Sequence, residues 1–303
     1  MTANTVLSDI NEIQVGYFLN GSKWYDTQAK SAYDQRVKQA KAPEVADAIG
    51  KARAMSESFL IWAKANGYKG PVKEVYWTAR PGVLAKASGS TADSKKNPTD
   101  ILVRFSSGPA RGLLGLSAKA TKTSGDIGFK NPGIGTVDRS LGINLADEYK
   151  NQETQLVKKF NLNNSANTRK QDIRANPGIK THTEAIGVQI LSAMRDVLLT
   201  RLLRMKNDEL RSYLLKDWMD AEIMFPPYVK VTGQGYKEPY KATVMDPTKN
   251  EKLDALAKYP ITLEKVGNES IGVKAGEKKI MKMRFKFESE KMASTVKMSG
   301  DPW

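Results

Sequence analysis

Asp100 and Lys119 are the residues of this chain whose types and spacing best suit a chemical reaction. Asp100 begins an apolar stretch with the composition of a β-strand, and Lys119 lies in a second such stretch after a Gly-Pro turn. Two strands joined in this way form a hairpin, so we expect both side chains to reach one end of it, with Ser117 and Lys119 on the same strand face. A carboxylate beside a lysine suits phosphodiester hydrolysis. The carboxylate would hold Mg²⁺, which acidifies a bound water, and the lysine would position that water or stabilise charge on the phosphate.

The segments around these residues, NPTD (97–100) and GLSAK (115–119), resemble the PD-(D/E)xK nuclease motif in its viral G-x-S-x-K variant. The resemblance extends over about residues 43–135 and implies a restriction-endonuclease-like core, a mixed sheet flanked by helices. It also implies that an acidic residue on the first helix completes the metal site, for which Glu57 is our candidate. The chain departs from the motif at Ser117, because a hydroxyl cannot supply the negative charge of the second acidic residue.

The resemblance implies a metal-dependent deoxyribonuclease that uses Mg²⁺ or Mn²⁺. In this hypothesis Asp100 and Glu57 are the metal ligands, Lys119 contacts the water or the phosphate, and Ser117 is an ancillary group. Two other functions remain open: a non-catalytic nucleic-acid-binding protein on the same fold, which Ser117 favours, and a structural protein of a virion or nucleoid. The corresponding structural interpretations are a turn carboxylate at Asp100, an ordinary strand serine at Ser117 and a solvated lysine at Lys119.

The chain is strongly basic, with 48 Lys and Arg against 33 Asp and Glu and a formal net charge of +15. Basic residues are concentrated in three separated segments, 104–139, 158–180 and 274–297. This charge favours a polyanionic partner, most simply duplex DNA, and the separation favours a surface assembled by folding over a disordered arm. Solubility alone is the alternative explanation. The candidates for contacts with DNA near the expected core are Arg104, Lys122, Lys130 and Asn131, the last two in a loop at 129–133.

The composition excludes several classes of site. The chain has no Cys, which excludes a disulfide scaffold, a thiolate nucleophile and a Cys-ligated zinc site, and its single His excludes a multi-His metal site. No apolar run is long enough to span a membrane, and residues 1–14 lack the pattern of a secretory signal. We therefore expect a soluble protein of the cytoplasm, of the host cytoplasm if a phage encodes it. The sequence leaves homo-oligomerisation open.

Hydrophobic periodicity predicts an α/β protein with a long helix and a β-rich C-terminal part. The expected helices are 27–40, 43–65 and 184–218, with partly helical, polar residues at 143–175 that include an exposed connection at 161–174. Loops are expected at 81–98 and 121–142. The expected strands are 72–78, 100–105, 113–120, 228–232, 241–245, 261–266, 270–274, 280–287 and 291–298. We divide the chain into an N-terminal extension (1–42), the nuclease-like core (43–150) and a remainder (151–303) that is either separate or continuous with the core.

Overall fold

The protein is a mixed α/β molecule that forms two compact units, each discontinuous in sequence. The computed structural model describes residues 3–92, 97–121, 131–219, 225–249 and 251–303. Unit 1 comprises Met1–Ile127 and Glu222–Asn250, and unit 2 comprises Gly128–Ala221 and Glu251–Trp303. These boundaries differ from the divisions at residues 42 and 150 that the sequence suggested. The described helices do not include one that is both long and apolar enough to cross a membrane.

Three helices precede the first strand of unit 1: α1 (Ala3–Leu19), α2 (Thr27–Val37) and α3 (Ala42–Ala65). The helix α3 confirms the prediction, with Pro43 in its first turn and the left-handed Gly67 just after its end. The helix α1 was not predicted. It is largely buried, and the side chain of Asn11 donates a hydrogen bond to the Ala48 carbonyl of α3 at 2.9 Å. The first 42 residues are therefore an integral part of unit 1.

The sheet of unit 1 has the order β1-β2-β3-β4-β5. Its strands are β1 (Lys69–Trp77), β2 (Ile101–Ser107), β3 (Leu113–Thr121), β4 (Tyr228–Gln234) and β5 (Lys241–Met245). The strand β2 is antiparallel to both β1 and β3, β4 runs parallel to β3, and β5 is antiparallel to β4. The last two strands enter the sheet from more than a hundred residues further along the chain, which no local pattern predicts.

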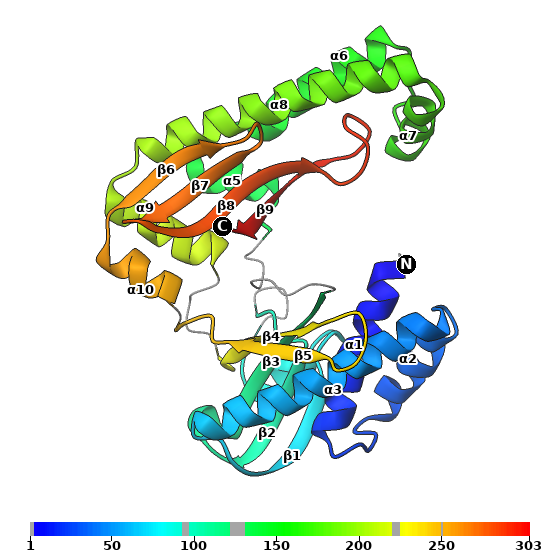
Figure 1. Cartoon of the computed structure of the whole chain (residues 1–303), viewed down its shortest axis with the longest axis vertical. Helices are drawn as coiled ribbons and strands as arrows, with labels where there is room; N and C mark the ends of the chain where they lie inside the picture. Colours follow the sequence, from blue (N-terminus) through cyan, green and yellow to red (C-terminus); the bar gives the residue numbers. More distant parts are fainter. Residues whose placement is uncertain (1–2, 93–96, 122–130, 220–224, 250) are drawn as a thin grey trace. The chain divides into compact units, whose positions relative to one another are not determined.

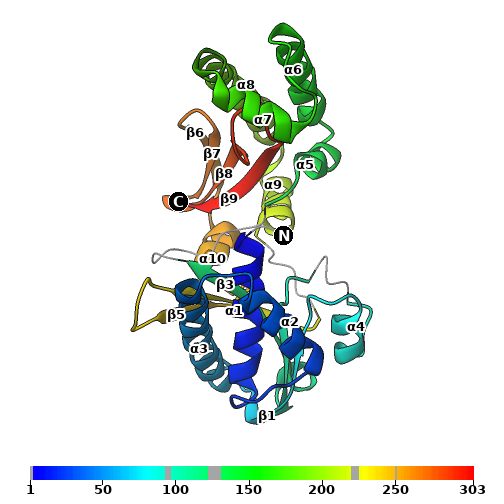
Figure 2. The same ribbon diagram turned by 90° about the vertical axis from the view of Figure 1, so that its right-hand side faces the viewer.

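Helices cover both faces of this sheet (Figure 2). The helices α1 and α3 pack on the face that carries Ile101, Val103 and Leu116. On the opposite face the short helix α4 (Val83–Ser88) packs through Leu84 and Ala87 against β2 and β3. The prediction of an uninterrupted loop over 81–98 is wrong, because α4 is needed to bury this second face. Alternating side chains of β2 thus enter two different hydrophobic clusters.

Unit 2 contains six helices in its described part (Figure 1). They are α5 (Ile134–Leu141), α6 (Leu145–Lys159), α7 (Ala166–Ala175), α8 (Pro177–Leu203), α9 (Asn207–Tyr213) and α10 (Glu251–Lys258), with a π-helical turn at Leu214–Trp218. The single long helix predicted over 184–218 is wrong in extent, since α8 begins earlier and ends at Leu203. The helix α5 also lies inside the segment predicted as an irregular loop.

The unit 2 sheet is an antiparallel meander of the order β6-β7-β8-β9. Its strands are β6 (Ile261–Val266), β7 (Ser270–Ala275), β8 (Lys278–Phe287) and β9 (Val296–Pro302). The first three confirm the predicted strands. The last begins five residues later than predicted, because Lys291–Ser294 lies in the connection between β8 and β9. One face of the sheet joins α8 and its neighbouring helices in a single hydrophobic core.

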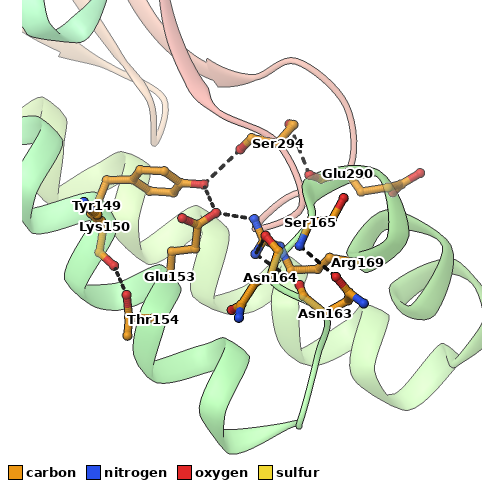
Figure 3. A network of polar contacts seen from close by, with 10 residues as sticks. All are labelled: Tyr149, Lys150, Glu153, Thr154, Asn163, Asn164, Ser165, Arg169, Glu290 and Ser294. Carbon is orange, nitrogen blue, oxygen red and sulfur yellow. Dashed lines mark hydrogen bonds and ion pairs between the residues drawn. The ribbon is translucent and has the colours of Figure 1, made fainter.

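A buried arginine orders the connection between α6 and α7 (Figure 3). Arg169 is 4% exposed, donates hydrogen bonds to the carbonyls of Asn163 and Asn164, and forms an ion pair with Glu153. The segment predicted as an exposed connection at 161–174 is therefore tied to the unit, and most of it belongs to α7. A charged group at this depth is retained because carbonyls and a carboxylate replace its lost hydration.

Candidate functional site

Asp100 lies at the point where β2 and β3 separate. Its backbone amide donates to the Leu116 carbonyl at 2.9 Å, and its own carbonyl accepts from Thr78 at 3.0 Å, so it is held between two strand ends. The pairing of β2 with β3 ends there, whereas β3 continues to Thr121 beside β4. The Asp100 carboxylate accepts a hydrogen bond from the Ala118 amide at 2.7 Å. The carboxylate thus accepts the hydrogen bond of an amide that lies beyond the end of the β2–β3 pairing.

The residues before Asp100 fix its position. The Asn97 side chain accepts from the amide and the hydroxyl of Thr99 at 3.1 and 2.7 Å, and donates to the Pro226 carbonyl at 3.0 Å. Gly115 lies beside this segment, and a Cβ built there would be only 2.2 Å from the Thr99 Oγ1. The close approach of 97–100 to β3 therefore requires glycine at position 115.

Lys119 and Ser117 both lie beside the Asp100 carboxylate, as the hairpin arrangement predicts. The Lys119 Nζ is 3.7 Å from Asp100 Oδ2, and the Lys119 side chain is 55% exposed. The Ser117 hydroxyl donates to the same oxygen at 3.4 Å, and the residue is 1% exposed. Ser117 is therefore enclosed by the protein, while Lys119 can reach both Asp100 and a molecule in solution.

The second carboxylate at this site is Glu12, which the sequence analysis missed. It projects from α1 and accepts a hydrogen bond from the Trp77 indole at 3.2 Å. The pKa of Glu12 is raised to about 8, mainly by burial and to a lesser extent by the negative charge of Asp100. Burial also raises the pKa of Asp100, against the opposing effects of Lys119 and the Ala118 amide. A pair of carboxylates whose ionised forms are both disfavoured is an environment that a cation would stabilise.

The sequence does contain a pattern that predicts the helix carrying Glu12. Val6, Ile10 and Ile13 recur at helical spacing and are all buried in α1. The helix was overlooked because polar residues separate these positions.

Glu57, the carboxylate expected from the first helix, lies elsewhere. The helix α3 buries Ala52, Met55 and Phe59 against the sheet and α1, and Glu57 falls on the exposed side of the same helix. There it lines a surface pocket of about 460 Å³ together with Arg53 and the β4–β5 hairpin. The assignment of Glu57 to the site is corrected for this reason, since helical periodicity turns it away from the face on which the site forms.

Of the four residues expected to contact DNA, the structure describes Arg104 and Asn131. Arg104 donates to Glu74 at 2.6 Å and to the Ala87 carbonyl at 2.8 Å, so it ties β1, β2 and α4 together. Lys122 and Lys130 lie outside the described residues. Asn131 is exposed and belongs to unit 2.

The donor set at this site fits a hard divalent cation. Mg²⁺ is commonly held by one or two carboxylates, with waters and substrate phosphate completing its shell, and Glu12 and Asp100 supply two. Within the described ranges no group of three Asp, Glu, His or Cys residues forms a larger ligand cluster. Comparisons with protein-family models, with curated proteins and with solved structures found no match to this chain.

Proposed function

We propose that unit 1 is a metal-dependent deoxyribonuclease that hydrolyses DNA phosphodiester bonds. The observation that carries the proposal is the convergence of Glu12, Asp100 and Lys119 where β2 and β3 separate. These residues come from a helix, a strand entry and a neighbouring strand. Two carboxylates and an exposed lysine are the groups that such hydrolysis needs. Because the fold brings them together, this observation does not depend on the short sequence motif.

The topology of unit 1 supports a restriction-endonuclease-like core. A helix precedes three antiparallel strands, a fourth strand runs parallel to the third, and helices lie on both faces. This agrees with the mixed, helix-flanked sheet that the motif implies. The proposed core therefore comprises unit 1, from α1 to β5, rather than residues 43–150. Glu12 takes the role that was assigned to Glu57, that of the acidic residue on the first helix.

Each side chain has a separate task in this proposal. Glu12 and Asp100 would hold Mg²⁺ or Mn²⁺, and a bound cation supplies a more acidic water and positive charge at the scissile phosphate. The Ala118 amide and the Ser117 hydroxyl orient the Asp100 carboxylate. Lys119 extends from the same place toward solvent, where its ammonium group can donate to a phosphate oxygen and stabilise charge that develops during hydrolysis.

Ser117 supports a second candidate, a non-catalytic DNA-binding protein on the same fold. It stands where the motif has its second acidic residue, and it is 1% exposed against Asp100. A neutral side chain there leaves one negative charge fewer for a cation. Salt-dependent binding of DNA without cleavage would support this candidate over the nuclease.

The test is cleavage of supercoiled plasmid and linear duplex in Mg²⁺, Mn²⁺ or EDTA. We expect metal-dependent cutting that falls by at least about 100-fold in Glu12→Gln, Asp100→Asn and Lys119→Met. Glu57→Gln is the matched control and should cut at the wild-type rate, because its side chain lies on the exposed side of α3. Wild-type cutting by Glu12→Gln, or loss of cutting in Glu57→Gln alone, would contradict the proposed site.

A further inference from the structure

The unit 2 sheet has one face that carries a row of basic side chains. Along β8, Met281, Met283 and Phe285 point into the hydrophobic core, so the intervening Lys282, Arg284 and Lys286 point to the other face. Figure 1 shows the helices α5 and α8 behind this sheet, with no described helix drawn across its near side. The basic row is therefore on a face that the described part of unit 2 leaves uncovered.

The neighbouring strands extend this row into a patch. Lys286 is paired with Lys297 of β9, and Arg284 with Ser270 and Ser299. Lys282 stands opposite Gly272 of β7 on one side and Asp301 of β9 on the other. The cations of this patch, which we call the basic face, are Lys274, Lys279, Lys282, Arg284, Lys286 and Lys297. Four carboxylates lie on or beside it: Glu264, Glu269, Glu288 and Asp301.

Half of these cations form no ion pair with the described part of the chain. Ion pairs join Lys274 to Glu264, Arg284 to Glu269 and Asp301, and Lys297 to Glu288. Among the described residues, Lys279, Lys282 and Lys286 have no carboxylate within ion-pair distance. Lys282 and Lys286 lie on the same face four residues apart, about 13 Å along the strand, with the ion-paired Arg284 between them. Lys279 lies on this face beyond the bulge, next to Lys274 of β7.

An aromatic ring orients one end of the basic face. The Trp303 ring packs over Gly272, where a Cβ would lie only 2.5 Å from the indole. The ammonium groups of Lys274 and Lys279 lie 5.2 and 4.7 Å from the ring centroid. Cation–π attraction holds both groups on the outer side of the sheet, where Lys274 is also paired with Glu264.

We propose that the basic face binds the phosphodiester backbone of DNA. Charge complementarity is the argument, because unpaired lysines in a row match a polyanion and gain from counterion release. An anionic membrane fits less well, since none of the exposed large hydrophobic residues described belongs to β6, β7, β8 or β9. The inference rests on the proposed function only for the choice of DNA, and it assigns binding to unit 2 rather than to the site in unit 1.

The experiment measures binding of the full chain to a fluorescein-labelled duplex by anisotropy in EDTA, from about 50 to 200 mM salt. The test variant is Lys279→Gln/Lys282→Gln/Lys286→Gln. The matched control, Lys150→Gln/Lys158→Gln/Lys258→Gln, removes three exposed lysines of the unit 2 helices. The variant Lys279→Arg/Lys282→Arg/Lys286→Arg keeps the charge, and thermal melting verifies that each protein is folded.

We expect the Gln variant of the basic face to bind at least about tenfold more weakly, with a salt slope reduced by about 2–3, since each phosphate contact contributes about 0.9. The Arg variant and the control should retain the wild-type slope. If the test and control variants lost the same amount of affinity for DNA, the loss would reflect net charge alone and the proposal would be overturned. Unchanged binding by the Gln variant of the basic face would overturn it as well. Tighter binding to phosphatidylserine vesicles than to DNA, lost in the Gln variant, would also overturn it in favour of a membrane.

The same proteins separate this inference from the proposed nuclease. If wild type does not cut DNA in Mg²⁺ but the Gln variant loses binding, the nuclease proposal fails and the basic face stands. If wild type cuts and the Gln variant binds normally, the basic face is wrong and the nuclease stands.

Discussion

Two carboxylates and a lysine share the space where β2 and β3 separate, and their charges are not balanced by the protein alone. Glu12 and Asp100 are both largely withdrawn from water, and Lys119 is the one cation that opposes them in the contacts described. Such an arrangement costs stability in the absence of a further cation. It is retained where the charges serve binding or catalysis.

The pH dependence of stability tests this interpretation of Glu12 in EDTA. The folded protein holds the Glu12 proton up to about pH 8, whereas the ordinary pKa of the group is 4.5. The contribution of protonated Glu12 to the free energy of unfolding is therefore complete below about pH 4.5 and is lost as the pH rises through 8. We expect Glu12→Gln, which keeps an acceptor for Trp77, to exceed wild type by up to about 5 kcal/mol at pH 9 in urea unfolding and to match it at pH 4.

Glu57→Gln is the control for this comparison, because its exposed side chain lies away from the site. It should follow the wild-type profile at every pH. Identical profiles for Glu12→Gln and wild type would show that Glu12 is not held in the buried environment described.

At the scale of elements, the close approach of segment 97–100 to β3 positions Asp100. We expect Gly115→Ala to lose about 1–3 kcal/mol of stability, because its Cβ would overlap Thr99 and press on Tyr228. Cleavage should fall with it as Asp100 is displaced. In unfolding measurements, adding Thr99→Ala should relieve part of the overlap, so the double variant should lose less than the two single losses together.

Gly135→Ala provides the matched glycine control. This helical glycine of α5 has Arg139 3.6 Å from the position of a Cβ, which is ordinary contact, so the change should be neutral or stabilising. Strict additivity of Gly115→Ala and Thr99→Ala would indicate that the two positions do not touch.

Elements with a strong local pattern could be predicted from the sequence, and those defined by packing could not. The helix α3 and the strands β2 and β3 have continuous apolar patterns, and their positions were predicted correctly. The helices α1 and α4 were missed, since one is interrupted by polar residues and the other is only six residues long. Consequently the proximity of Asp100, Ser117 and Lys119 was predicted, whereas Glu12 was not.

At the scale of the whole molecule, the two units have separate hydrophobic cores. The core of unit 2 joins the β6–β9 sheet to its helices, and the clusters of unit 1 contain residues of unit 1 only. Phe285 and Phe59 are each fully buried in one of these cores. A substitution in one core should therefore leave the other intact.

We expect Phe285→Ala to lower the stability of unit 2 by about 3–5 kcal/mol and Phe59→Ala to lower that of unit 1 by a similar amount. Scanning calorimetry should show two transitions, with each variant moving a different one. A single transition that both variants shift equally would indicate one cooperative molecule instead.

The sequence by itself determined the α/β class, the basic charge, the exclusion of cysteine and multi-histidine chemistry, and the hairpin that brings Asp100 to Lys119. These properties depend on composition or on residues close together in the chain. Tertiary structure alone decided that Glu12 rather than Glu57 faces Asp100, that β4 and β5 complete the first sheet, and that the lysines of β8 share one uncovered face. Such contacts join residues far apart in sequence, and only the packing of helices and strands selects which side chains meet.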